Sequence, residues 1–289
     1  MLSIKNLSKT YENGIKALID VDLEIPRGMF GLLGPNGAGK STLMRTLATL
    51  QEPDTGTVML GDLDVLRDKD GVRRILGYLP QEFGVYPRFS AEAMLNHFAV
   101  LKGISDGGER RKTVERILDV TNLTPVRKQK LGTFSGGMRQ RFGVAQALIG
   151  DPELIIVDEP TAGLDPQERQ RFLNLLSEIG ENVVVILSTH IVEDVRELCS
   201  QMAIIDRGRV LMSGDPRAFA AELEGKVWQK SIEKGEVGAY ETSMKVISKR
   251  LLAGRPSIHV LCDTPPGDGF ERVVPDLEDV YLAAIEAAS

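Results

Sequence analysis

The feature that most restricts the fold of this chain is a glycine-rich segment, GPNGAGKST, at residues 34–42. It fits the pattern G-x-x-x-x-G-K-[ST], and it lies between the apolar stretch MFGLLG at 29–34 and the helically spaced stretch STLMRTLATL at 41–50. Glycines let the backbone wrap closely around an anion and aim several N–H groups at phosphate oxygens. The helix that follows adds the positive end of its dipole. A strand, this loop and a helix in that order predict a phosphate-binding loop in an α/β protein.

Two side chains of this loop add chemistry that its backbone lacks. The side chain of Lys40 is long enough for its ammonium to reach the β and γ phosphates of a nucleotide, and the hydroxyl of Ser41 can bind Mg²⁺. A glycine-rich turn that fits the pattern by chance is the alternative, and the position between an apolar strand and a helix argues against it. The predicted nucleotide-binding residues of the loop are Gly34, Pro35, Asn36, Gly37, Ala38, Gly39, Lys40, Ser41 and Thr42.

The rest of the chain predicts an α/β fold with a smaller C-terminal part. Apolar strands at 75–81, 154–159 and 183–190 alternate with helical stretches, which indicates a parallel sheet covered on both faces. Polar and apolar residues alternate at 2–11 and 17–25, which predicts an attached antiparallel part and therefore a mixed sheet architecture. We expect one domain at 1–225, with a helical subdomain at about 82–150. A small α+β domain is expected at 226–289, with strands at 227–232, 244–252 and 256–262 and a helix at 277–288.

Polar side chains follow three of the predicted parallel strands. Asp158 and Glu159 end LIIVDE, Gln81 ends ILGYLPQ, and His190 ends VVVILSTH. Ligands bind at this edge of open α/β sheets. Asp158 can serve a Mg²⁺ ion beside the phosphates, and Glu159 can orient or deprotonate water. Gln81 can bind the metal or the attacking water, and His190 can donate to a γ-phosphate. For Gln81 and His190, a purely structural strand end remains an equal alternative.

A second anion-binding pattern opens another predicted helix, FSGGMRQR at 134–141. Ser135 is a good N-cap, and Gly136 and Gly137 expose backbone N–H groups. By itself this is an ordinary helix start. Because one nucleotide already has its phosphate loop, the second pattern makes most sense if it serves the nucleotide of another copy in a head-to-tail dimer.

The composition of the 289-residue chain bears on whether it binds nucleic acid or enters a membrane. The net charge of −6 and the pI of about 5.3 do not resemble the basic surface of a nucleic-acid-binding protein. No apolar run approaches the roughly 18 residues needed to span a bilayer, and the polar start does not resemble a signal peptide. Two cysteines at distant positions fit a reducing compartment. We therefore expect a cytoplasmic protein, and any membrane role requires a partner that supplies the spanning helices.

Over about residues 1–220 the chain resembles the ABC ATPases. The motifs stand in the order of that family: Tyr11, the loop 34–42, Gln81, FSGGM at 134–138, LIIVDE at 154–159, AGLD at 162–165, and His190. The resemblance implies ATP and Mg²⁺ as cofactors, with Lys40, Glu159 and His190 in catalysis and with Ser41, Gln81 and Asp158 at the metal. It also implies that Tyr11 stacks on adenine, that Ser135 and Gly137 close on the opposite nucleotide, and that Asp165 crosses the dimer.

The resemblance extends to a branch of the family. The chain is similar to the ATP-binding subunits of exporters of drugs, lipids and polysaccharides that have separate membrane subunits. The similar segments are LGTFSGGMRQR, PTAGLDP and PDLEDVYLAAIE. Phe134 and Met138 depart from the usual Leu and Gln of the signature, and the intact Ser-Gly-Gly still implies activity. We expect an ATP-hydrolysing transport motor, peripheral on the cytoplasmic face of the membrane, that docks its permease through residues 82–98. A non-transport ABC ATPase is the alternative.

Overall fold

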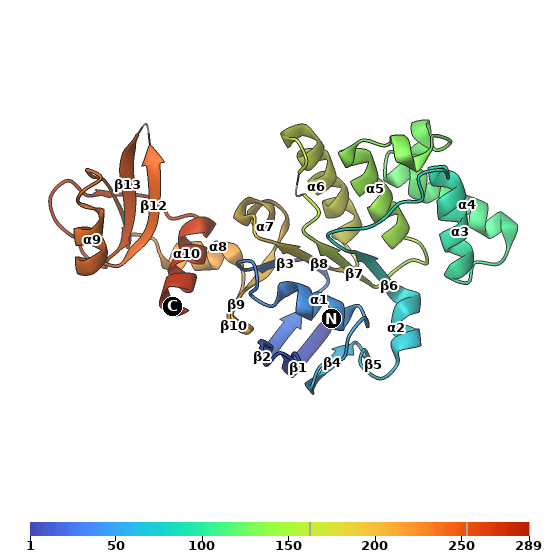
Figure 1. The fold of residues 1–289 in the computed structure, drawn as a ribbon, viewed down its shortest axis with the longest axis horizontal. Helices are drawn as coiled ribbons and strands as arrows, with labels where there is room; N and C mark the ends of the chain where they lie inside the picture. Colours follow the sequence, from blue (N-terminus) through green and yellow to red (C-terminus); the bar gives the residue numbers. More distant parts are fainter. Residues whose placement is uncertain (162, 253, 289) are drawn as a thin grey trace.

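A six-stranded sheet occupies the centre of the computed structural model, which describes residues 1–161, 163–252 and 254–288 (Figure 1). The strand order is β10–β9–β3–β8–β7–β6. All pairs are parallel except β9 with β10, which form a hairpin. The strands are β3 (Gly28–Leu33), β6 (Leu76–Leu79), β7 (Leu154–Asp158), β8 (Val184–Thr189), β9 (Gln201–Asp206) and β10 (Arg209–Gly214). β7 and β8 are buried along their whole length, as their apolar sequences predict.

A separate antiparallel sheet of order β2–β1–β4–β5 covers one face of the central sheet. Its strands are β1 (Leu2–Thr10), β2 (Lys16–Ile25), β4 (Thr55–Leu60) and β5 (Leu63–Asp64). Helix α1 (Lys40–Leu47) lies between the two sheets, and its Leu43, Met44 and Leu47 are fully buried in their common core (Figure 1). The short helix α2 (Lys69–Ile75), capped by Asp68, follows β5. Packing between two sheets fixes the start of α1, where the phosphate loop ends.

Helices cover the other face of the central sheet. These are α5 (Gly136–Ala147), α6 (Pro166–Gly180) and α7 (Val192–Leu198). Helix α5 also packs with α3 (Ala91–Leu101) and α4 (Gly107–Val120) around a second core that includes Leu95, Ile117 and Phe142. The 3₁₀ turns Thr124–Val126 and Leu131–Thr133 connect α4 to α5. Helices α3 and α4 are separated by residues 102–106, and α4 begins at the glycine pair of GISDGG.

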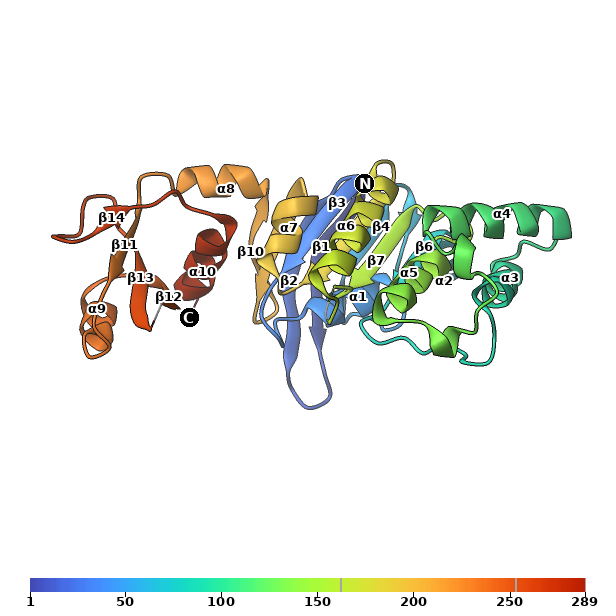
Figure 2. The same cartoon turned by 90° about the horizontal axis from the view of Figure 1, so that it is seen from above.

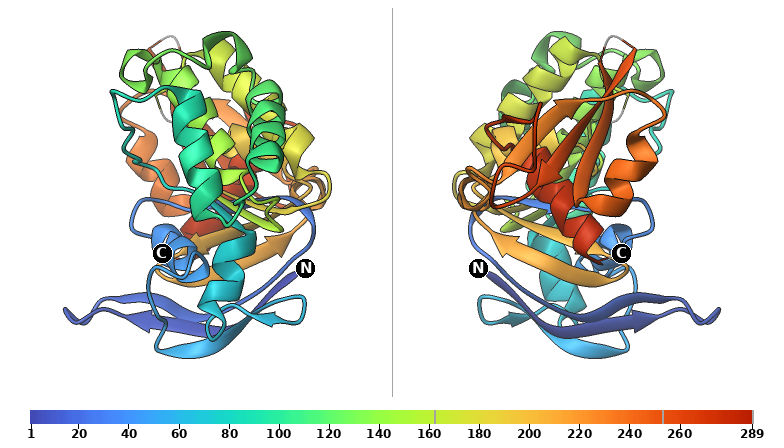
Figure 3. Two further views of the ribbon diagram at one scale, coloured as in Figure 1. Left: turned by 90° about the vertical axis from the view of Figure 1, so that its right-hand side faces the viewer. Right: turned by 90° about the vertical axis from the view of Figure 1, so that its left-hand side faces the viewer.

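The last part of the chain forms a small antiparallel sheet of order β12–β13–β11–β14. Figure 2 and the two end views of Figure 3 place it at one end of the molecule, opposite α3 and α4. Its strands are β11 (Val227–Ser231), β12 (Val246–Leu252), β13 (Arg255–Leu261) and β14 (Glu271–Arg272). The helices around it are α8 (Pro216–Glu222), α9 (Val237–Ser243) and α10 (Leu277–Ala288). Helix α10 turns back, and its Leu277 and Val280 join the core on the helical face of the central sheet.

The observed architecture confirms the predicted fold class. The sequence did not predict helices α2, α8 and α9 or the two-residue strand β14. These elements are short, so the periodic signal that each carries is weak. Among the described residues, no helix is long and apolar enough to cross a bilayer.

Candidate functional site

An open cavity of about 640 Å³ lies where the carboxyl ends of the central strands meet α1. Its volume falls in the range of small-molecule sites. The residues that line it are Tyr11, Ile15, Lys16, Ala17, Pro35, Asn36, Gly37, Ala38, Gly39, Lys40, Ser41, Thr42, Gln81, Glu159 and Arg207. The predicted phosphate loop forms one wall, and Gln81 and Glu159 extend from the neighbouring strand ends.

The glycines of the loop are required by its geometry. Gly39 caps α1 with a φ of 111°, and a Cβ at this position would lie 2.4 Å from the carbonyl oxygen of Ala17. A Cβ on Gly34 would lie 2.3 Å from the carbonyl oxygen of Ile205. The loop is also hydrogen-bonded to the β9–β10 turn, because Gly208 N donates to the carbonyl of Ala38 at 2.8 Å. Strand β2 and the hairpin turn therefore hold the loop in the shape that its glycines permit.

Lys40 is a buried cation of the cavity, and only 5% of its surface is exposed. Its ammonium donates to the carbonyls of Gly34 at 2.6 Å and Pro35 at 3.1 Å, and lies 3.9 Å from Glu159 Oε1. Burial lowers the pKa of Lys40, and the charges of Glu159 and Asp158 oppose that shift. An ammonium has three N–H groups, so two hold the loop and the third can reach a ligand.

Glu159 lies where the polar strand ends converge. Gln81 Nε2 donates to its Oε2 at 3.1 Å, and His190 Nδ1 lies 3.3 Å from its Oε1. Its backbone has a φ of 46°, in the left-handed region that is costly for a residue with a side chain. Such strain collects at functional sites. Three side chains that the sequence placed at separate strand ends, Gln81, Glu159 and His190, are thus brought together.

Asp158, the residue before Glu159, is buried beneath the loop. Burial raises its pKa, and the charge of Glu159 adds to that rise, whereas the hydroxyls of Ser188 and Ser41 and the charge of Lys40 oppose it. Its Oδ1 is buried without a hydrogen-bond partner in the described part of the chain. A buried carboxylate oxygen without a donor is costly unless a ligand or an ion satisfies it.

Tyr11 stands at the edge of the cavity, where the residue is 36% exposed. Its hydroxyl lies 3.1 Å from Thr42 Oγ1 and donates to Gln51 Oε1 at 3.3 Å. Gln51 Nε2 in turn donates to the carbonyl of Thr42 at 3.0 Å. Gln51 therefore ties the aromatic ring to the loop. The sequence did not indicate this residue, because nothing in its neighbourhood marks it.

The second anion-binding pattern lies outside this cavity. Ser135 caps α5 by accepting from Met138 N at 3.2 Å, and both Ser135 and Gly136 are exposed. Gly137 is buried, and a Cβ there would lie 2.1 Å from Glu168 Oε2. Asp165 is exposed and caps α6 by accepting from Glu168 N at 2.9 Å. Ala162 of the 162–165 loop falls outside the described residues.

Comparison with known proteins decides the family. A family model described as ABC transporter matches residues 18–162. The uncharacterized ABC transporter ATP-binding protein YxlF of Bacillus subtilis is 32% identical over 99% of this chain and 100% of that protein. This chain belongs to the ABC transporter family. It is an ATPase of the kind that drives such transporters.

Two further relatives bear on this ABC ATPase. The daunorubicin/doxorubicin resistance ATP-binding protein DrrA of Streptomyces peucetius is 32% identical over 92% of this chain and 78% of its own length. The dimeric post-hydrolysis structure of the ATP-binding cassette MJ0796, bound to ADP and Pi, has a TM-score of 0.67 and 29% identity. It covers 74% of this chain and 98% of that chain.

The departure of this ABC ATPase from the usual signature has a packing explanation. Phe134 is 3% exposed and meets Phe142 of α5 edge to face, with ring centroids 6.5 Å apart. Met138 is half-buried and packs against the same core. Both residues therefore serve the core of α3, α4 and α5, and they leave Ser135 and Gly136 on the surface.

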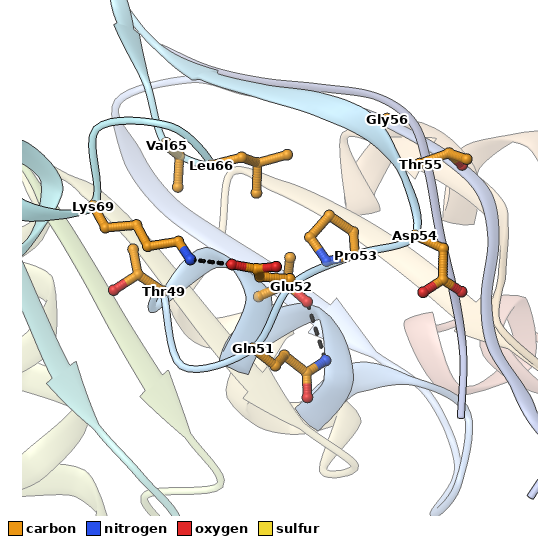
Figure 4. Close-up of a pocket in the computed structure, with 11 residues that line it drawn as sticks. Thr49, Gln51, Glu52, Pro53, Asp54, Thr55, Gly56, Val65, Leu66 and Lys69 are labelled. Atoms are coloured by element: carbon orange, nitrogen blue, oxygen red, sulfur yellow. Dashed lines mark hydrogen bonds and ion pairs between the residues drawn. The ribbon is translucent and has the colours of Figure 1, made fainter. Parts of the chain in front are cut away.

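A separate cavity of about 270 Å³ lies beyond Gln51, between the end of α1 and β4 (Figure 4). Lys69 reaches across it to form an ion pair with Glu52, and Gln51 Nε2 donates to Thr46 Oγ1 at 3.1 Å. Because the lysine is neutralised by the adjacent carboxylate, this cavity lacks a free positive charge for a phosphate. The cavity of Lys40, in contrast, combines a buried ammonium with the glycine-rich loop.

Two charged cavity residues, Arg207 and Lys16, were not foreseen from the sequence. Arg207 reaches the cavity from the β9–β10 turn, and Lys16 reaches it from β2. The Arg207 guanidinium also donates to the carbonyl of Ala288 in α10 at 3.2 Å. Neither residue belongs to a local motif, so only the folded chain brings them to the site.

Gly39 offers a direct test of the loop geometry. Gly39→Ala is expected to lower the stability of this ABC ATPase by about 2 kcal/mol or more, because the methyl group meets a backbone oxygen at an unfavourable φ. Nucleotide binding should be lost as well. Thermal unfolding and a nucleotide titration measure the two effects. Gly235→Ala is the control, because Gly235 has open space around it and should change stability by less than about 0.5 kcal/mol. Equal melting temperatures for the two variants would contradict the argument.

Proposed function

We propose that this ABC ATPase is the motor of a drug exporter whose membrane-spanning subunits are separate chains, and that two copies close head to tail on two ATP molecules. The observation that carries this proposal is the division of the site. One cavity gathers Lys40, Gln81 and Glu159, with His190 beside Glu159, whereas the anion-binding start of α5 at Ser135 lies elsewhere and is exposed. The second half of each site then comes from the partner copy.

Each side chain of the cavity has a proposed role in hydrolysis. The loop N–H groups and Lys40 hold the β and γ phosphates, and Tyr11 stacks on the adenine. Glu159 acts as the base that takes a proton from the attacking water, and Gln81 positions that water. His190 holds the γ-phosphate and orients Glu159. In the closed dimer, Ser135, Gly136 and Gly137 donate to the γ-phosphate held by the opposite copy, and Asp165 reaches across the interface.

Mg²⁺ fits the oxygen donors in and beside the cavity. The unpartnered Oδ1 of Asp158 and the nearby hydroxyl of Ser41 are hard oxygen donors of the kind that Mg²⁺ prefers, and Gln81 adds an amide oxygen. No cluster of three or more acidic, cysteine or histidine side chains occurs in the described part of the chain. A Mg²⁺ ion shared with phosphates needs no such cluster, because it is usually held by one or two carboxylates together with the substrate. When bound, it neutralises phosphate charge.

The surface after Gln81 is the proposed contact with the permease. Tyr86 and Phe89 are 61% and 53% exposed and meet edge to face with ring centroids 6.3 Å apart. Leu131 N donates to the carbonyl of Phe89 at 2.9 Å, and Gly132 N donates to that of Pro87 at 3.1 Å. The loop of the two aromatic rings is thus bonded to the segment that leads into Ser135. Movement at the permease would be passed to the γ-phosphate contacts of the other copy.

Removal of the two rings tests this contact. The double variant Tyr86→Ala, Phe89→Ala is expected to keep the ATPase rate of the isolated chain within about twofold and to lose most of its membrane association, because exposed aromatic residues carry much of the binding energy of interfaces. Flotation of cell membranes with the tagged chain measures the association. Leu50→Ala is the control, since Leu50 is also 61% exposed but lies after α1. Undiminished flotation of the double variant would count against this surface.

The direction of transport and the location follow from the same proposal. The chain is expected on the cytoplasmic face of the membrane, with its ATP site exposed to the cytoplasm. DrrA, named for daunorubicin and doxorubicin resistance, suggests a drug as cargo. Inside-out vesicles that contain the chain and its permease should accumulate an anthracycline when ATP is added. ATP-dependent loss of drug from preloaded vesicles would indicate import instead.

The chain divides, in this proposal, into an ATPase domain at 1–225, with its helical subdomain at about 82–150, and an accessory domain at 226–289. The small sheet has a core of its own around Ile232, Ile258 and Val260. Helix α10 is shared, because it packs on β12 and also on α7 and α8. The accessory part is therefore in contact with the element that follows His190.

A further inference from the structure

A fully buried carboxylate lies behind the catalytic residues. Asp194 is in the first turn of α7 and is 0% exposed. Its Oδ2 accepts from Thr161 Oγ1 at 2.6 Å and from Thr189 Oγ1 at 3.3 Å, and its Oδ1 accepts from Arg169 Nε at 2.8 Å. A buried charge is tolerated only when it is paired and hydrogen-bonded. Asp194 satisfies that condition with three side chains from three separate segments.

Each of these partners is a close neighbour of a proposed catalytic or dimer-contact residue. Thr161 is two residues after Glu159, and Thr189 immediately precedes His190. Arg169 lies one helical turn after Asp165, and its N–H donates to the Asp165 carbonyl at 2.8 Å. The segments that carry Glu159, His190 and Asp165 therefore meet at the carboxylate of Asp194.

The hydroxyl of Thr189 makes this arrangement specific for His190. It donates to Asp194 and accepts from Ile191 N at 2.9 Å. The backbone is thus anchored on both sides of His190, whose own side chain is half exposed and lies 3.3 Å from Glu159. An exposed imidazole would otherwise sample several orientations. Anchoring its backbone restricts the positions from which it can reach Glu159 and a phosphate.

We propose that Asp194 is a positioning residue that holds His190, and with it Glu159, in the geometry that hydrolysis requires. The inference rests on the proposed roles of Glu159 and His190. Asp194 does not line the nucleotide cavity, so it acts through these neighbours and not on ATP itself. The phosphate loop is held instead by β2 and the β9–β10 turn, which Asp194 does not contact among its described bonds.

Because none of the described bonds of Asp194 is to the phosphate loop, a substitution of Asp194 is expected to lower kcat without weakening nucleotide binding. Asp194→Asn keeps the size of the side chain but removes the charge that pairs with Arg169. We expect kcat to fall at least tenfold, while KM for ATP and the Kd for Mg-ADP stay within about twofold. Thr189→Val is a milder variant that cuts only the anchor beside His190, and it should reproduce the loss of kcat. It also keeps the inference testable if Asp194→Asn does not fold.

The controls distinguish positioning from a general loss of stability. Asp279→Asn removes another buried carboxylate, 1% exposed and 2.7 Å from His259 Nδ1, in the C-terminal part. It should lower the melting temperature without lowering kcat. In the His190→Ala background, Thr189→Val should lower kcat by less than twofold more, because its effect is transmitted through His190.

Some outcomes would contradict the inference about Asp194 alone, and others would contradict the proposed role of His190. If His190→Ala loses hydrolysis while Asp194→Asn and Thr189→Val keep the kcat of the original chain, the inference is wrong and the proposed function stands. The inference would also be wrong if the double variant Thr189→Val, His190→Ala lost kcat by the product of the two single losses, because independent effects would mean that Thr189 does not act through His190. If His190→Ala itself keeps full activity, the proposed role of His190 fails and the inference fails with it.

Discussion

Replacing Glu159 with Gln is expected to lower steady-state ATP hydrolysis by about 100-fold or more, because the amide cannot accept the proton of the attacking water. The side chain keeps its length, so its contact with Gln81 can persist. Loss of the negative charge beside Lys40 also removes repulsion toward a γ-phosphate. ATP should therefore remain bound, and a head-to-tail dimer should accumulate. Phosphate release and size-exclusion chromatography with ATP measure the two effects.

The control for this variant lies at the other end of the same strand. Glu153 is exposed and immediately precedes β7, whereas Glu159 follows it. Glu153→Gln should leave both hydrolysis and elution volume unchanged. A Glu159→Gln protein that binds ATP but elutes as a monomer would contradict the composite site, and one that hydrolyses ATP at the original rate would contradict the assignment of the base.

Replacing Lys40 with Met is expected to weaken ATP binding by about 100-fold, the scale for truncating one partner of a buried charge pair. Methionine can fill the space of the lysine stem, so the fold should persist. The carbonyls of Gly34 and Pro35 lose their donor, and Glu159 loses the cation 3.9 Å away. A titration with labelled ATP, together with thermal unfolding of the variant, measures binding separately from stability.

A second lysine provides a matched control. The ammonium of Lys102 also donates to two carbonyls, those of Arg73 and Leu76, each at 2.7 Å, and burial also lowers its pKa. It lies at the end of α3, away from the cavity. Lys102→Met should reduce stability and leave the Kd for ATP unchanged. Similar affinities of the two methionine variants for ATP would show that Lys40 does not hold the phosphates.

The sequence predicted the central fold because its signals are local and strong. Runs such as LIIVD and VVILST contain only apolar residues until they end, which is typical of strands that are buried on both faces. The seven-residue helices α2, α8 and α9 carried no comparable signal. Helices this short are stabilised mainly by their surroundings, such as the caps that Asp68 and Asp215 provide for α2 and α8.

The parts of the candidate site that are formed by neighbouring residues in the sequence could be predicted. A phosphate loop is such a case, because its conformation depends on the φ angles of its own glycines. Gln51, Arg207 and Asp194 are different. Each is a common polar residue in an ordinary stretch of sequence, and its importance comes from partners that are distant along the chain.

Residues adjacent in the sequence were enough to predict nucleotide-phosphate binding and to place Gln81, Glu159 and His190 at strand ends. That these three side chains meet, with Lys40 beside them and Asp194 behind them, was visible only in the folded chain, as was the position of Ser135 outside their cavity. The physical reason is that backbone shape and strand formation follow from neighbouring residues, whereas distances between side chains depend on strand order. That order is set by packing of the whole chain, which places β6, β7 and β8 side by side.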